Sequence, residues 1–256
     1  MNRLANSPRF KAAKNIILRS FPEQINDLIL ILLFSLKYLF VSKRKELVIV
    51  SAADKSHLDS VQNLFDSLQK FEKDSTLVFY DIGLNHEQEN NFKSKYPQII
   101  YKKFKFASYP EFVSKVDSDG KVGSYAWKPQ IIKECISDYD TSVLWLDAGC
   151  KINKKLKLIR INLNVKGLYI ASSVGKIYEW TYSKSIENIN LPQKYLNKKN
   201  FASGMIGINP QKKYKKELLD EWAKLSLNKN IIAPEGSSRK NHRQDQSILT
   251  MLIYKN

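Results

Sequence analysis

One acidic residue stands at the most informative point of the sequence. Asp147 directly follows the apolar run Val143–Leu146, and two small residues, Ala148 and Gly149, come next. A short run of bulky apolar residues predicts a buried strand, with Asp147 at its carboxyl end. In open α/β sheets, ligands bind in the crevice outside the carboxyl ends of the strands. Asp147 is therefore our main candidate for an active-site residue.

A carboxylate in this position suits a hard divalent cation. Mg²⁺ or Mn²⁺ held by one or two carboxylates can bridge the two phosphates of a nucleotide and offset the charge that develops on a leaving group. Ala148 and Gly149 would let the diphosphate approach the backbone closely. The alternative, that Asp147 caps a turn or pairs with a nearby lysine, stays open from the pattern alone.

Strand and helix patterns alternate along the chain around Asp147. A continuous apolar run at 46–51 predicts the first core strand, apolar residues at helical spacing over 58–68 predict a helix, and 76–81 restores strand character. A helix over 127–136 leads into the strand that ends at Asp147. This βαβ pattern predicts an α/β domain with a mostly parallel central sheet.

Four short segments follow one another in the sequence, namely Tyr125–Pro129, Leu144–Gly149, Phe201–Gly207 and His242–Ser247. Together they resemble glycosyltransferases of the GT-A fold. The closest likeness is to the group related to glycosyltransferase family 8 and to relatives of uncharacterised function that carry a Trp-x-Asp-Ala-Gly segment. The resemblance covers roughly residues 46 to 254 and implies a single Rossmann-type catalytic domain over 46–256.

The resemblance also implies an activity. A GT-A-like, hexosyltransferase-like enzyme would move a sugar from a nucleoside diphosphate sugar, with a uridine diphosphate sugar as the expected donor. The acceptor would be a glycan or a lipid-linked molecule in polysaccharide or glycoconjugate synthesis.

A metal site at Asp147 is implied, with one departure from the family pattern. Asp147 stands where the family has the first acid of its metal-binding Asp-x-Asp signature, so Mn²⁺ or Mg²⁺ is the expected cofactor. The second acid is replaced by Gly149, and the family's late metal-binding histidine has no clear counterpart unless His242 supplies it. Lysine and arginine side chains are the alternative clamp for the phosphates.

The resemblance assigns the donor nucleotide to three parts of the chain. The turn after the first strand, which includes Ser51 and Ala52, would contact the base. Trp127 and Lys128 precede the Asp147 strand where such enzymes contact the nucleotide, although Trp127 could equally belong to the core. Arg243 is a candidate phosphate ligand through its fork of donors, and a solvated surface arginine is the alternative.

Sugar and acceptor would be met by residues later in the chain. Ser203 and Gly204 stand where the family has small residues facing both sugars, although a glycine could also serve a strand bulge. Trp180 could stack on an acceptor sugar or pack in the core. Asp245, with Gln246 beside it, would act as the general base in an inverting reaction or position the sugar in a retaining one. Stabilisation of a helix start is the other role open to Asp245.

Net charge leaves a second class of function open. The chain carries 42 Lys and Arg against 25 Asp and Glu, a formal net charge of +17, which attracts polyanions, anionic lipids or phosphorylated substrates. A polyanion-binding or nucleic-acid-binding module is therefore the alternative, although no nucleic-acid motif is present and we expect no such partner. Another nucleotide-using α/β transferase is possible as well, but GxGxxG, Walker A, GxSxG and HExxH motifs are all absent.

The first 45 residues differ from the rest. A basic start precedes the apolar run at 25–41, which Asp27 and Lys37 interrupt. This pattern predicts a helical segment that lies on a membrane surface and is retained, with a packed soluble helix and a spanning helix as alternatives. The two cysteines, Cys135 and Cys150, form no disulfide or metal motif, so we expect a cytoplasmic, membrane-associated protein.

Overall fold

A six-stranded sheet forms the centre of the computed structural model, which describes residues 46–256 apart from 118–119, 121 and 256. The strand order is β3-β2-β1-β4-β6-β5. The first four strands along the chain run parallel: β1 (Leu47–Ala53), β2 (Thr76–Asp81), β3 (Ile100–Lys103) and β4 (Ser142–Leu146). The other two lie antiparallel to their neighbours: β5 (Leu168–Lys176) and β6 (Lys199–Ile208).

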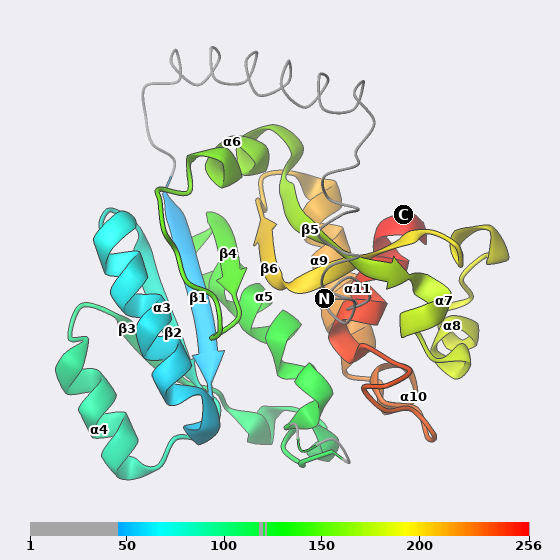
Figure 1. The fold of residues 1–256 in the computed structure, drawn as a ribbon, viewed down its shortest axis with the longest axis horizontal. Coiled ribbons are helices and arrows are strands. Elements are labelled where there is room, and N and C mark those ends of the chain that lie inside the picture. The colour runs from blue at the N-terminus through cyan, green and yellow to red at the C-terminus, as the bar shows by residue number, and fades with distance from the viewer. Residues whose placement is uncertain (1–45, 118–119, 121, 256) are drawn as a thin grey trace, which may run out of the picture. The chain divides into compact units, whose positions relative to one another are not determined.

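Helices cover both faces of this sheet (Figure 1). Those packed on one face are α3 (Leu58–Phe71), α4 (His86–Lys95) and α6 (Lys157–Lys166). Those packed on the other are α5 (Trp127–Tyr139), α9 (Lys213–Ser226) and α11 (Gln244–Lys255). Shorter helices complete the second layer: α7 (Ile177–Trp180), α8 (Ser183–Ile189) and α10 (Lys229–Ile232).

β1 shows why the sheet is buried on both sides. Val48 and Val50 belong to the core under α5, α9 and α11, whereas Leu47 and Ile49 belong to the core under α3, α4 and α6. All four are at most 1% exposed, and burial of each such side chain stabilises the fold by roughly 1.5–3 kcal/mol. A strand with two buried faces must be apolar throughout, which is why its sequence is a continuous apolar run.

The parallel pairing of β1 with β4 positions the site. Val50 pairs with Trp145, so the two strands end at the same edge of the sheet, with Asp54 and Asp147 just beyond them. The prediction of an α/β domain with a mostly parallel sheet is confirmed. The edge strand β5 was not predicted from the sequence, and its side chains are only half-buried or exposed.

The predicted membrane-associated segment, including the apolar run 25–41, lies outside the described residues, so the division of the chain at residue 45 stays a prediction. Within the described part, no helix has both the length and the apolar character that crossing a bilayer requires.

Candidate active site

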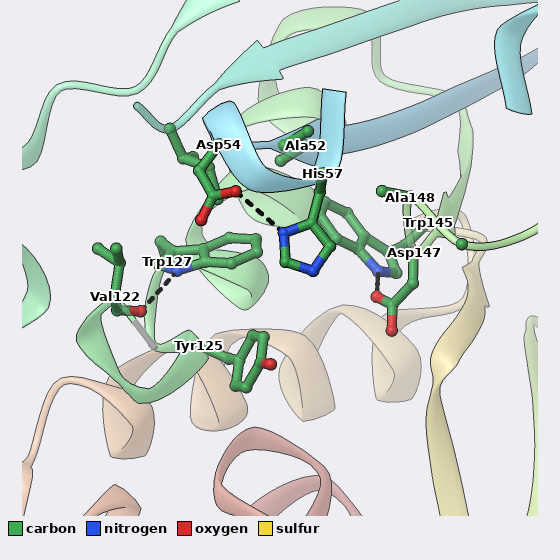
Figure 2. A pocket seen from close by; sticks show the side chains of 12 residues that line it. Ala52, Asp54, His57, Val122, Tyr125, Trp127, Trp145, Asp147 and Ala148 are labelled. Carbon is green, nitrogen blue, oxygen red and sulfur yellow. Dashed lines mark hydrogen bonds and ion pairs between the residues drawn. The ribbon is translucent and has the colours of Figure 1, made fainter. Parts of the chain in front are cut away.

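A cavity of about 300 Å³ lies at the carboxyl ends of β1 and β4. Figure 2 shows Asp54 and Trp127 toward one end of it and Trp145 and Asp147 toward the other. Its walls come from the end of β1 and the turn after it, the residue after β2, the loop before α5 with the first residue of that helix, and the end of β4 with the turn after it: Ala52, Ala53, Asp54, His57, Ile82, Val122, Tyr125, Trp127, Trp145, Asp147, Ala148 and Gly149. The predicted site residues Ala52, Trp127, Asp147, Ala148 and Gly149 are therefore brought together.

Asp147 is the open carboxylate of this site, with a side chain that is 48% exposed. Its Oδ1 accepts a hydrogen bond from Trp145 Nε1 at 2.7 Å, and its backbone N donates to Gly204 O at 2.9 Å. A Cβ at position 204 would lie 3.2 Å from Asp147 Oδ2, so glycine leaves this oxygen accessible. Gly204 thus lies beside Asp147.

Behind Asp147 lies a buried lysine that joins two acids. Lys128 Nζ is 3.2 Å from Asp147 Oδ1 and 3.1 Å from Asp245 Oδ2. Ser203 adds its Oγ at 3.3 Å and its carbonyl oxygen at 3.4 Å, while the rings of Tyr125 and Trp145 lie within 6 Å of the same ammonium. We call Lys128, Asp147 and Asp245 the charged triad. Its members come from α5, the end of β4 and α11.

Burial and charge act in opposite directions within the triad. Burial alone would lower the pKa of Lys128, but Asp147 and Asp245 outweigh it, so the pKa lies above its ordinary value and the amine stays protonated. Burial raises the pKa of Asp245, and Lys128 offsets part of that rise. Because Asp245 is only 4% exposed in its side chain, Asp147 is the acid of the triad that solvent or a substrate reaches.

Asp117 holds the two turns that begin the helices of the triad. Its Oδ2 accepts hydrogen bonds from Ser124 Oγ at 2.9 Å and from Gln244 Nε2 at 3.0 Å. Ser124 and Gln244 have φ values of 49° and 48°, a left-handed conformation that costs a residue other than glycine about 1–3 kcal/mol. Strained residues therefore stand shortly before Lys128 and immediately before Asp245, and one carboxylate ties them together.

The turn after β1 contributes an acid and a histidine to the cavity wall, a pair that was not predicted from the sequence. His57 Nδ1 lies 2.9 Å from Asp54 Oδ1, and Ser56 donates to the same oxygen through its N at 2.9 Å and its Oγ at 2.6 Å. Burial alone would raise the pKa of Asp54, but hydrogen bonds from Ser56 and His57 outweigh it and lower the pKa. An Asp-x-x-His spacing directly after a buried strand is the signal that could have found this pair.

Other predicted site residues lie apart from the cavity. Ser51 is buried in β1, and its Oγ has no hydrogen-bond partner among the described residues. Trp180 and Arg243 stack on each other on the α7 and α11 side, and neither lines the cavity. Gln246 follows Asp245 in the first turn of α11, where its N donates to Arg243 O at 3.0 Å.

His242 does not fit a metal site with Asp147. It is fully buried, its Nδ1 accepts from Tyr182 N at 3.3 Å, and its Nε2 lies 3.0 Å from Ile232 O. Both ring nitrogens are thus used by the backbone, and the pKa falls to about 4 because burial disfavours the charged ring.

The rest of the donor set does not fit the expected divalent cation either. Gly149 replaces the second acid, and Asp147 Oδ1 is already engaged by Trp145 and by the ammonium of Lys128. Among the residues that the structure describes, no three His, Cys, Asp or Glu side chains cluster in a way that could hold a metal ion. One free carboxylate oxygen is a poor site for a cation that prefers several oxygen ligands.

The fold is similar to that of several solved glycosyltransferase structures. The WbbM bifunctional glycosyltransferase matches at a TM-score of 0.54 and 14% identity over 84% of this chain, and mouse xyloside xylosyltransferase 1 at 0.52 and 13% over 83%. Galactosyltransferase LgtC, solved with donor and acceptor sugar analogues, matches at 0.50 and 19% over 80%. This chain has the GT-A fold.

The matches span 38% of the WbbM chain, 82% of the mouse chain and 70% of the LgtC chain. A family profile described as a protein of unknown function (DUF1647) matches residues 31–133. The search of curated proteins gives no match.

Proposed function

We propose that this GT-A domain transfers a sugar from a nucleoside diphosphate sugar, with a uridine diphosphate sugar as the expected donor, to a glycan or lipid-linked acceptor. The observation that carries the proposal is the cavity at the carboxyl ends of β1 and β4, which has an open carboxylate, Asp147, backed by a buried cation, Lys128. The structural neighbours are glycosyltransferases, which supports the reaction class.

The cavity suggests how the donor lies. Its wall at Asp54 and His57 offers an acceptor and an aromatic ring for the nucleotide base, and Trp127 adds an apolar face. Ala148 and Gly149 at the other end allow the diphosphate close to the backbone. The sugar would then lie beside Asp147 and Gly204.

In the transfer, an acceptor hydroxyl forms the new bond to the anomeric carbon, the bond to the diphosphate breaks, and the hydroxyl proton is released. Positive charge develops on the sugar as the old bond weakens, and the open carboxylate of Asp147 is placed to stabilise it. Asp245 is buried against Lys128, which supports a positioning role in holding the triad over direct proton removal.

The proposal is tested by thermal shift with UDP, GDP, CMP and S-adenosylmethionine, because a ligand that binds the native state raises its apparent stability. We expect one nucleoside diphosphate to raise the melting temperature, and its sugar conjugate to be turned over. Asp147→Asn should retain the fold and lose turnover, while Asp59→Asn, an exposed acid of α3, should behave as wild type.

Two outcomes would contradict the proposal. One is full turnover in Asp147→Asn. The other is an absence of any nucleotide shift together with tight, salt-sensitive binding to a polyanion, which would favour the binding module.

A further inference from the structure

Arg243 and Trp180 form a contact that the proposed donor site does not use. The guanidinium carbon of Arg243 lies 3.9 Å from the ring centroid of Trp180, and Arg243 N donates to Trp180 O at 3.0 Å. Gly175, with φ of 82°, lies against the same indole, since a Cβ at this position would be only 2.3 Å from Trp180 Nε1. The stacked pair is therefore held by the end of β5, by α7 and by the start of α11.

The charge of Arg243 is not balanced by the described part of the protein. Its guanidinium makes no ion pair or hydrogen bond with any described residue, whereas Arg160, a structural arginine, bonds Glu72 Oε2 at 2.6 Å. Burial and the neighbouring Arg239 lower the pKa of Arg243, yet an arginine remains charged at physiological pH. A stacked guanidinium with free donors beside a second arginine suits a carboxylate or phosphate, which it can bind with two parallel hydrogen bonds.

Arg243 lies near the charged triad in the sequence but outside the proposed donor cavity. Asp245, two residues further along, is buried against Lys128, and Lys128 in turn contacts Asp147. The cavity lies on the β1 side of Asp147, and neither Arg243 nor Trp180 lines it. Arg243 and Trp180 are both partly exposed, so the stacked pair is open to a ligand.

We propose that Arg243 and Trp180 bind an anionic acceptor, with Arg243 holding a carboxylate or phosphate carried by the sugar that receives the new glycosidic bond. This inference rests on the proposed function and adds the chemical class of the acceptor to it.

The test compares probes that share one ring and differ in charge: methyl glucoside, its uronate and its 6-phosphate. Dissociation constants are measured by saturation-transfer NMR on the full chain in the presence of UDP. We expect one of the two acidic probes to bind about tenfold more tightly than the neutral glucoside, the gain typical of a charged hydrogen-bonded pair. Preference for the uronate or for the phosphate tells the two sources of the anion apart.

Two variants locate the effect. Arg243→Gln should remove the preference, and Lys184→Gln, which deletes an exposed charge on the neighbouring helix α8, should keep it. UDP binding by Arg243→Gln, followed by thermal shift, reports that the variant is folded and that its donor site is intact.

Each other outcome overturns the inference in a distinct way. Equal binding of the neutral and acidic probes, or no binding of the acidic ones, excludes the anionic acceptor while UDP binding still supports a transferase. Loss of UDP binding in Arg243→Gln with an unchanged probe preference assigns Arg243 to the donor phosphates instead. Failure of wild type to bind any nucleotide removes the proposed function itself.

Discussion

Lys128 Nζ lies 3.1 Å from Asp245 Oδ2, and both side chains are at most 4% exposed. A charge buried this deeply is tolerated only when it is paired, because removal of either partner leaves the other without compensation. Asp147 reaches the same ammonium from the cavity side. The stability of the domain and the geometry of its open carboxylate therefore depend on one lysine.

We expect Lys128→Met to lower the free energy of unfolding by about 3–5 kcal/mol, since it leaves Asp245 buried without its cation. Combining it with Asp245→Asn should restore part of that loss, because the second change removes the unpaired charge. Urea unfolding of the wild type, both single variants and the double variant gives the coupling energy. Additive losses would show that the two residues are not coupled.

Divalent cations are expected to add little to nucleotide binding in the wild type, because only one oxygen of Asp147 is open and position 149 carries no acid. Gly149→Asp should make binding respond to Mn²⁺, since a Cβ at this position would have no atom within 4 Å apart from those of its chain neighbours. Titrations of UDP in EDTA and in Mn²⁺ measure both effects. A wild-type affinity that collapses in EDTA would show that a metal is held despite the missing acid.

The ring of His57 is expected to contribute to nucleotide affinity as one wall of the cavity. We predict that His57→Ala weakens UDP binding about tenfold, in the range measured when a stacking ring is removed from a base, and that His57→Phe retains most of the affinity. Isothermal titration of UDP measures both. His86→Ala, an exposed histidine of α4, is the control, and an equal loss there would remove the argument for stacking.

Asp117 is expected to act on the reaction without touching a substrate. Asp117→Ala removes the acceptor shared by Ser124 and Gln244, so the two left-handed turns lose the bond that offsets part of their strain. A shift of the triad by about 1 Å would lower turnover on the order of a hundredfold. Steady-state kinetics should show the loss mainly in kcat, and an unchanged kcat would contradict this role.

Stability should fall with acid because of His242. Its pKa is about 4 in the folded chain and 6.5 unfolded, so it contributes stability that is fully present above pH 6.5 and is lost as the pH falls toward 4. Between about pH 7.5 and about pH 5 the loss amounts to roughly 2 kcal/mol. Urea unfolding at the two pH values measures it. His242→Gln should lose less over the same range, and an equal loss would assign the effect to other groups.

Much of the fold could be predicted from local sequence patterns. A doubly buried strand has to be apolar throughout, so β1 and β4 are legible from Leu47–Val50 and Val143–Leu146 alone. The end of such a run also marks where the carboxylate of Asp147 must emerge. An edge strand such as β5 has no such requirement, because part of each side chain remains in water, and its apolar start at Leu168–Ala171 is followed by small and polar residues.

By itself the sequence determined the α/β class and the place of Asp147 at the edge of the sheet, since both follow from neighbours along the chain. Only the tertiary structure decided that Lys128 bridges Asp147 and Asp245, that His57 faces the cavity with Asp54, and that His242 is held by backbone groups. The physical reason is that the charge balance of a buried group depends on partners brought by other elements. α5, β4 and α11 meet around Lys128 only after the sheet and its helices have packed.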